Sequence, residues 1–258
     1  MTVLYSSPVF GPVHSRRLGI SLGINLLPAD GKCCSFDCIY CECGFNKDFR
    51  PHRPFPTREE VREALRLQLE KMKEEGECPD VLTFAGNGEP CMHPEFPGIV
   101  DDVIELRNQL CPGAKVSVLS NATQILRSDV FDALLKVDNN ILKLDTVCPD
   151  YIRMVDRPAS RSYDVEKIIE AMTRFGRRCV IQTMFMQGEH EGQEVANISD
   201  DFVRPWLEAV KRIQPREVMI YTIDRETPSH NLRKATPAQL DAIAERVRQM
   251  GIPCSASY

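Results

Sequence analysis

VLTFAGNGEP, residues 81–90, is a short apolar run that passes directly into a polar turn with two glycines. Such a run, followed at once by glycine, is typical of a strand that is buried on both faces of a sheet. A helix is predicted before it, because Thr57 and Glu60 have the spacing of a capping box and the apolar stripe after them stops at Gly76. A second helix is expected after it, over roughly residues 97–110. The stretch therefore predicts one unit of a parallel α/β sheet.

The same succession of strand and helix recurs along the chain. Further strands are expected at residues 18–27, 115–120, 141–145, 178–186 and 217–223. Further helices are expected near residues 129–135, 164–175 and 200–213, and the last begins at Thr236 with a second capping box and stops at Gly251. Six β/α units in 258 residues predict a single α/β domain, either an incomplete barrel or an open doubly wound sheet.

Length and composition restrict the class of protein. The chain is 43% hydrophobic, enough for a large core, and has no apolar run near the roughly 20 residues that span a bilayer. Its first residues lack the order of regions found in a signal peptide, so we expect a cytoplasmic protein without a membrane partner. Thiols stay reduced in that compartment, and 11 cysteines then indicate metal or redox chemistry rather than disulfides. The net charge of −5 disfavours nonspecific wrapping of nucleic acid.

Polar residues gather at the carboxyl ends of the predicted strands. Parallel strands bring these ends to one face, which carries the chemistry in barrel proteins. A cysteine-rich loop follows the first strand, and the later strands end in Gly86 to Pro90, Ser120 to Ala122, Lys143 and Asp145, Gln182 and Thr183, and Tyr221 to Arg225. One functional site is therefore predicted at that face.

GKCCSFDCIYCECG, residues 31–44, is the loop after the first strand. Cys34, Cys38 and Cys41 form a C-x3-C-x2-C array, and thiolates this close in sequence can hold one face of a compact iron–sulfur cluster. A structural zinc site is one alternative, although zinc usually takes four ligands from two separated pairs. Unliganded cysteines are a further alternative.

With Tyr40 ahead of its last cysteine, this array resembles the signature of the radical S-adenosylmethionine (radical SAM) superfamily, and the resemblance extends over essentially the whole chain. It implies that Cys34, Cys38 and Cys41 hold a [4Fe–4S] cluster whose fourth iron binds SAM. Reductive cleavage of SAM would then give a 5′-deoxyadenosyl radical that abstracts hydrogen from a substrate. The implied fold is a partial (β/α)6 barrel in one domain over residues 1–258, with an N-terminal extension to about residue 17 and a cluster loop over about residues 28–56.

The resemblance also assigns SAM-binding roles to the strand ends. Residues 86–90 look like the family's glycine and glutamate motif, where backbone groups and the acid engage the SAM amino group. The expected cofactor-binding residues are Tyr40, Asn87, Gly88, Glu89, Asn121, Asp145, Gln182, Tyr221 and Thr222. The polar residues among them have a plainer alternative, which is to satisfy local backbone groups.

The segments NGEP, SNA, KLD, VIQTMF and YTIDR resemble the branch related to wyosine-type tRNA synthetases and to bacterial iron–sulfur oxidoreductases of unassigned substrate. The chain departs from the tRNA enzymes because it is compact and net acidic, without an obvious added tRNA-binding region.

Lys143 is the candidate catalytic residue, with a structural ion pair as its alternative. Candidates for an auxiliary cluster or for packing are Cys33, Cys43, Cys91 and Cys148, and candidates for packing alone are Cys78, Cys111, Cys179 and Cys254.

Two loops are candidates for substrate binding. Residues 45–58 mix phenylalanines with cations suited to phosphate and a stacked base, namely Lys47, Arg50, His52, Arg53 and Arg58. Residues 188–201 are acidic, include His190 and would form a lid. The alternative for both loops is a solvated surface loop. Arg16 and Arg17, ahead of the first strand, would meet an anionic group or pair with carboxylates. The substrate is then a small molecule, a peptide or an RNA base, and the electron donor is expected to be of flavodoxin or ferredoxin type. A noncatalytic metal-binding module is the alternative from another class.

Overall fold

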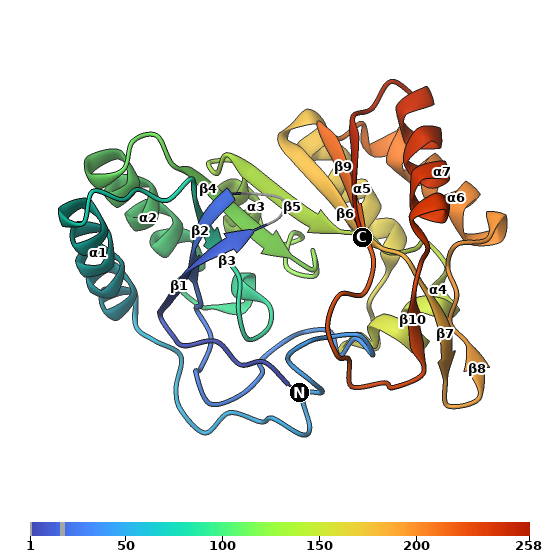
Figure 1. Cartoon of the computed structure of the whole chain (residues 1–258), viewed down its shortest axis with the longest axis horizontal. Coiled ribbons are helices and arrows are strands. Elements are labelled where there is room, and N and C mark those ends of the chain that lie inside the picture. The colour runs from blue at the N-terminus through green and yellow to red at the C-terminus, as the bar shows by residue number, and fades with distance from the viewer. Residues whose placement is uncertain (1, 16–18) are drawn as a thin grey trace.

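One sheet contains eight strands, which are Val9–Ser15 (β1), Gly19–Ile24 (β2), Val81–Phe84 (β3), Lys115–Ser120 (β4), Asn139–Lys143 (β5), Cys179–Met184 (β6), Glu217–Tyr221 (β9) and Cys254–Ser257 (β11). The computed structural model describes residues 2–15 and 19–258 and orders these strands β1-β2-β3-β4-β5-β6-β9-β11 (Figure 1). Neighbours from β2 to β11 are parallel, whereas β1 pairs antiparallel with β2. Because β1 and β11 are the two edges, the sheet is a partial barrel that stays open, as the sequence predicts.

Helices return the chain from one parallel strand to the next. They are Arg58–Glu74 (α1), Phe96–Leu110 (α2), Ser128–Leu134 (α3), Pro149–Tyr151 (α4), Val165–Phe175 (α5), Asp200–Ile213 (α6) and Pro237–Gln249 (α7), with short helical turns at Pro90–Met92 (η1), Ile152–Asp156 (η2) and Gly176–Arg178 (η3). Both predicted capping boxes are present, Thr57 with Glu60 and Thr236 with Gln239. They satisfy backbone groups left open in the first turn, which explains why α1 and α7 begin where the sequence predicts.

The strands separate two apolar layers of unequal size. In β5, Leu142 belongs to the large core between the sheet and the helices, whereas Ile141 faces the other way and meets Val180 and Met219. A separate apolar cluster, to which Ile39 belongs, surrounds the cysteine-rich loop. The helices therefore pack on the outer face of the sheet, and the inner face is left for the strand-end loops. Within the described residues, none of the helices combines the length and the apolar character needed to cross a membrane.

The structure corrects the sequence prediction in two regions. Both edge strands were missed: β1 lies in the expected N-terminal extension, and β11 consists of residues with weak strand preference that pair with β9. The expected loop at residues 188–201 contains a hairpin of β7 (Met186–His190) and β8 (Gln193–Glu194), which β10 (Leu232–Lys234) extends to a second, three-stranded sheet. β11 and β10 pair with strands that are remote in sequence, β9 and β7, so local periodicity carries no signal of that pairing. β1 and the β7–β8 hairpin pair locally, but Gly11, Pro12 and Gly188 interrupt their strand pattern.

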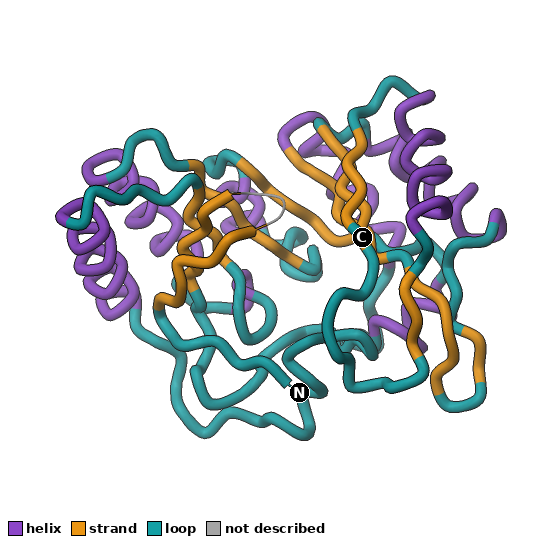
Figure 2. The backbone as a smooth tube through the Cα atoms, in the orientation of Figure 1, coloured by secondary structure: helices purple, strands orange, loops and turns teal. Residues whose placement is uncertain are grey.

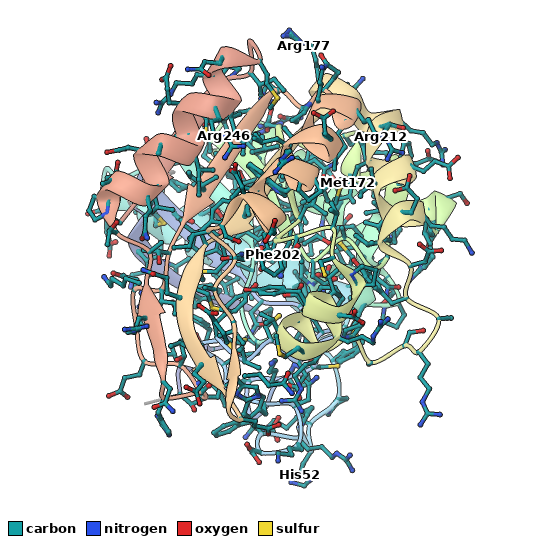
Figure 3. The ribbon with its side chains drawn as sticks, turned by 90° about the vertical axis from the view of Figure 1, so that its right-hand side faces the viewer. His52, Met172, Arg177, Phe202, Arg212 and Arg246 are labelled. Carbon is teal, nitrogen blue, oxygen red and sulfur yellow. The ribbon has the colours of Figure 1, made fainter. Side chains whose placement is uncertain are left out.

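The two ends of the large sheet differ in what they carry. Figure 2 shows long loops gathered at the lower end of the molecule, which includes the segment between β2 and α1. Figure 3 shows His52, from that segment, at the lower edge and Arg177, which precedes β6, at the upper edge. The lower end is therefore the one where the parallel strands stop, and it is the face at which the sequence predicts a site.

Candidate functional site

The cysteine loop lies at the end of the sheet where the parallel strands stop. Residues 25–57 join β2 to α1 with no helix and only one isolated bridge, in which Cys33 pairs with Gly88. On the other side of the loop, the Ile39 N–H donates to the Val155 carbonyl at 2.9 Å. The three predicted ligand cysteines are thus held between the turn after β3 and η2.

The three thiols share one largely apolar environment. Cys38 is buried in the cluster around Ile39, and Cys34 and Cys41 are half-buried against it. Burial raises the pKa of Cys34 to about 12 and holds that of Cys38 well above its usual range. The pKa of Cys41 falls to about 6, chiefly because the Cys43 thiol donates a hydrogen bond to it. Because metal ligation removes thiol protons, binding at this site is expected to strengthen as the pH rises.

Two further observations bear on the group that these thiols could hold. The Asn121 side-chain amide donates to the Cys34 sulfur at 3.5 Å, and hydrogen bonds to sulfur are among the features that tune iron–sulfur clusters. Among the described residues, no three His, Cys, Asp or Glu side chains are already placed around a single metal-ion position. A structural zinc ion usually takes four ligands from two separated pairs, whereas each cysteine of a cluster binds its own iron. Cys34, Cys38 and Cys41 fit a cluster and are the residues that would hold it.

The turn after β3 approaches the cysteine loop closely at its glycines. Gly86 and Gly88 have φ values of +135° and +140°. A Cβ at Gly88 would lie 1.9 Å from the Cys33 carbonyl oxygen, and one at Gly86 would lie 2.6 Å from the side-chain oxygen of Asn25. Glycine is required at both positions because no other residue tolerates that backbone and that proximity.

Glu89 ties this turn to the end of β4. Its buried carboxylate accepts hydrogen bonds from the Cys91 N–H at 3.0 Å, the Ser120 hydroxyl at 2.9 Å and the Asn121 N–H at 2.6 Å. Burial raises the pKa of Glu89 even though these donors lower it. Through the Asn121 backbone, Glu89 positions the side chain that donates to the Cys34 sulfur.

A buried charged group lies on another side of the thiols. The Lys143 ammonium contacts Asp145 Oδ2 and Asp156 Oδ1, each at 2.5 Å, and the Tyr40 hydroxyl donates to Asp145. The Cys38 thiol is 3.8 Å from Asp156 Oδ1. Burial alone would lower the pKa of Lys143, but the two carboxylates raise it well above its usual range. In this state the candidate catalytic lysine is a paired cation and not a free amine.

The other predicted SAM contacts differ in their hydrogen bonds. The Asn87 side chain binds the N-terminal segment, since it accepts the Tyr5 N–H at 2.8 Å and donates to the Tyr5 carbonyl at 2.9 Å. Thr222 Oγ1 accepts a backbone N–H from the residue after β10 at 2.8 Å. Gln182 lies on the inner face of β6, two residues beyond Val180, and Tyr221 ends β9 beside the cluster around Ile39. Tyr40, Glu89, Asn121 and Asp145 thus gather around the thiols, whereas Asn87 and Thr222 bind backbone.

The remaining cysteines are spread over different environments. Of the auxiliary candidates, Cys43 Sγ lies 3.5 Å from the Gly86 carbonyl oxygen, Cys91 lies in the large core, Cys148 borders the cluster around Ile39, and Cys33 is half-buried. Cys111 and Cys179 are buried, as predicted, and Cys254 is half-buried. Cys78 is exposed, so the prediction that it packs is wrong, because it lies in the exposed segment between α1 and β3.

Only some of the predicted substrate-binding side chains in the two candidate loops are exposed and available to a ligand. Lys47, Arg50, His52 and Arg53 are exposed, but Arg58 binds Asp102 through two hydrogen bonds of 2.6 and 2.8 Å. The rings of this loop pack within the protein, Phe45 against Arg157, Phe49 over Gly44 and Phe55 against His93. In the acidic hairpin, His190 hydrogen-bonds Ser229 at 3.0 Å. Arg16 and Arg17 lie outside the described residues.

Two residues at this site were not predicted from the sequence. Lys32 is almost completely buried in the cysteine loop, and its ammonium donates to the Gly44 carbonyl at 2.6 Å. Asp156, at the end of η2, reaches both Lys143 and Cys38. A lysine in a loop and an aspartate at the end of a short helical turn are normally solvated, so burial of these two could be seen only in the tertiary structure.

The fold and the site together define a partial-barrel α/β protein whose strand-end loops present three cysteines suited to an iron–sulfur cluster. The chain belongs to the radical SAM superfamily, because the family model "Radical SAM superfamily" matches residues 30–202. It is 31% identical over 224 residues to a UPF0026 protein of Helicobacter pylori (strain J99), covering 84% of this chain and 66% of that protein. It is 35% identical over 168 residues to a UPF0026 protein of Methanocaldococcus jannaschii, covering 64% and 49%. The chain thus spans less than two thirds of the length of these relatives.

Solved structures share the fold at low sequence identity. A radical SAM methyltransferase from Sphaerobacter thermophilus superposes with a TM-score of 0.68 at 16% identity, covering 92% of this chain and 66% of that chain. TYW1 with a lysine–pyruvate adduct bound superposes with a TM-score of 0.64 at 14% identity, covering 89% and 73%. At such identities these likenesses establish the architecture alone.

Proposed function

We propose that this chain is an enzyme that cleaves SAM reductively and uses the 5′-deoxyadenosyl radical to abstract hydrogen from a substrate. The observation that carries the proposal is the gathering of Cys34, Cys38 and Cys41 with Glu89 and Asn121 at the carboxyl end of a partial barrel. When bound, a [4Fe–4S] cluster supplies the electron for SAM cleavage.

The residues around the thiols suit the binding of a cationic, hydrogen-bonding ligand. Lys143, Asp145 and Asp156 together carry one net negative charge, which favours a sulfonium in a site of low dielectric. Glu89 orients the Asn121 backbone, and Tyr40 is oriented by its hydrogen bond to Asp145. The apolar cluster around Ile39 limits the access of water to the thiols, which protects reactive species at the site.

Modification of an RNA base is a second candidate. It is supported by the exposed cations Lys47, Arg50, His52 and Arg53, which belong to the loop that carries the thiols. Simultaneous replacement of Lys47, Arg50 and Arg53 by Gln is expected to weaken tRNA binding and to make it less sensitive to salt. The slope of the logarithm of the binding constant against the logarithm of the salt concentration should become shallower by roughly 0.9 for each phosphate that the variant no longer neutralises. Arg127→Gln, at an exposed site after β4, is the matched control. Equal tRNA binding by both variants would leave a small molecule or a peptide as the substrate.

The partners and the compartment follow from the proposed chemistry. Cluster reduction needs a one-electron donor of low potential, and we propose a flavodoxin or a ferredoxin as that donor. The proposed enzyme is then an oxidoreductase. The half-buried thiols Cys34 and Cys41 must stay reduced, so we propose a cytoplasmic location.

The test is anaerobic reconstitution of the protein with iron and sulfide, followed by dithionite and SAM. We expect about four irons per chain, an electron paramagnetic resonance signal that changes with SAM, and release of 5′-deoxyadenosine. Separate Ala replacements of Cys34, Cys38 and Cys41 should abolish all three, whereas Cys78→Ala, at an exposed thiol, should abolish none. Tightly bound zinc without SAM cleavage would instead support the noncatalytic metal-binding module.

A further inference from the structure

Lys32 is a charged side chain in a place where charges are costly. Its side chain is 1% exposed, and removing an ammonium from water costs several kcal/mol unless a partner compensates it. The ammonium donates to the Gly44 carbonyl at 2.6 Å and to Asp37 Oδ1 at 3.3 Å. Only the second of these partners carries a charge.

Asp37 compensates Lys32 only in part. Its side chain is 18% exposed, and Oδ1 also accepts the Asn46 N–H at 2.7 Å. Its other oxygen lies 4.0 Å from the Arg157 guanidinium, so one carboxylate serves two cations and a backbone amide. Lys143 is the opposite case, because it has two carboxylates at 2.5 Å. Lys32 therefore retains a positive charge that its protein neighbours do not balance.

The position of Lys32 shows where this charge acts. Residue 32 begins the cysteine segment and Gly44 ends it, so the hydrogen bond between them closes the loop around the thiols. The buried ammonium also interacts electrostatically with Cys41, Cys34 and Cys38. A fixed positive charge therefore lies beside whatever the three thiols hold.

We propose that Lys32 is a positioning residue whose ammonium closes the cysteine loop and stabilises the reduced form of a cluster held by Cys34, Cys38 and Cys41. The inference rests on the proposed function. Reduction of [4Fe–4S]2+ to [4Fe–4S]+ takes up one electron from the reductant and adds one negative charge at the site. A nearby cation stabilises that added charge, so it raises the reduction potential and helps the donor to deliver its electron.

The test is a potentiometric titration of the reconstituted full chain with dithionite, monitored by electron paramagnetic resonance, which needs no SAM turnover. Lys32→Gln is expected to lower the ratio of reduced to oxidised cluster at a fixed potential by roughly tenfold, equivalent to 59 mV for one electron. Lys32→Arg should restore most of the ratio because it keeps the charge. Lys73→Gln removes an exposed lysine from the last turn of α1 and should leave the ratio unchanged, because solvent screens that charge.

Asp37→Asn keeps the proposal falsifiable if Lys32→Gln fails to fold. The amide can still accept the Asn46 N–H, but the negative charge beside Lys32 is removed, so the potential should shift upward. A four-iron cluster whose potential is unchanged in Lys32→Gln, or that does not shift upward in Asp37→Asn, would overturn the role of Lys32 alone. Failure of the unmodified chain to assemble any four-iron cluster would overturn the proposed function itself.

Discussion

Gly88 shows how one residue positions the whole cysteine loop. Only glycine fits this position, for two reasons. The backbone φ is +140°, and the Cys33 carbonyl oxygen occupies the space that a Cβ would need. The bridge between these two residues places the start of the cysteine array against the turn after β3. Thiol placement therefore depends on a backbone contact and not only on the spacing of the cysteines.

Gly88→Ala is expected to abolish assembly of the cluster and to lower the free energy of unfolding by about 1–3 kcal/mol, because the new Cβ must displace the Cys33 carbonyl. Iron content after anaerobic reconstitution and chemical denaturation measure the two effects. Gly76→Ala is the matched control, since its φ is +76° and nothing lies within 4 Å of the added carbon. It should cost about 1 kcal/mol and retain all of the iron. Full iron loading of Gly88→Ala would refute this account of the loop.

At the scale of elements, one carboxylate joins α1 to α2. Asp102 accepts hydrogen bonds from Arg58 at 2.6 and 2.8 Å and from Arg62 at 3.1 Å. The hydrogen bond from Arg58 is the main cause that lowers the pKa of Asp102 below its ordinary value of 3.8. A carboxyl whose pKa is lowered on folding adds stability above its unfolded pKa and loses it as the pH falls through the folded value.

Asp102→Asn should lower the free energy of unfolding at neutral pH by about 1 kcal/mol, a modest figure because both arginines are exposed enough for solvent to screen the pair. The variant should also lose less stability than the unmodified chain when the pH falls below about 4. Denaturation curves at several pH values measure both effects. Asp129→Asn, which breaks an exposed pair with Arg127, should change stability by less than about 0.5 kcal/mol. Identical acid sensitivity in Asp102→Asn and the unmodified chain would contradict this role.

At the scale of the whole molecule, the sheet has a protected centre and two exposed edges. β4, β5 and β6 are flanked by strands on both sides and packed under helices, whereas β1 and β11 each have one neighbour. The second sheet of β10, β7 and β8 is small and depends on pairing between distant segments. Local opening should therefore require the most free energy at the centre of the large sheet.

Hydrogen exchange followed by mass spectrometry is expected to show slowest exchange in β4 to β6 and faster exchange in β7, β8 and β10. Anaerobic reconstitution with iron and sulfide should slow exchange in residues 31–44 and leave α7 unchanged, since ligation orders the cysteine loop. No protection of residues 31–44 in a protein that had bound four irons would place the iron elsewhere.

Prediction from the sequence succeeded where the signal is local. The helices at residues 58–74 and 237–249 follow from apolar periodicity and capping boxes, and six parallel strands follow from short apolar runs. The cysteine array resembles the radical SAM signature, and the radical SAM family model matches residues 30–202. The same method missed β11, because its partner β9 lies far away in the chain. It also missed β1 and the hairpin at residues 186–194, because Gly11, Pro12 and Gly188 interrupt their strand pattern.

The sequence by itself determined the alternation of strands and helices, the spacing of the three candidate ligand cysteines and the family to which the chain belongs. Only the tertiary structure decided which charges are buried and what they contact, as for Lys32 in the cysteine loop and Lys143 between two aspartates. It also decided that Asn87 binds the N-terminal segment and that Glu89 positions Asn121. The physical reason is that capping, periodicity and ligand spacing act over a few residues, whereas burial and compensation of a charge depend on segments that only folding brings together.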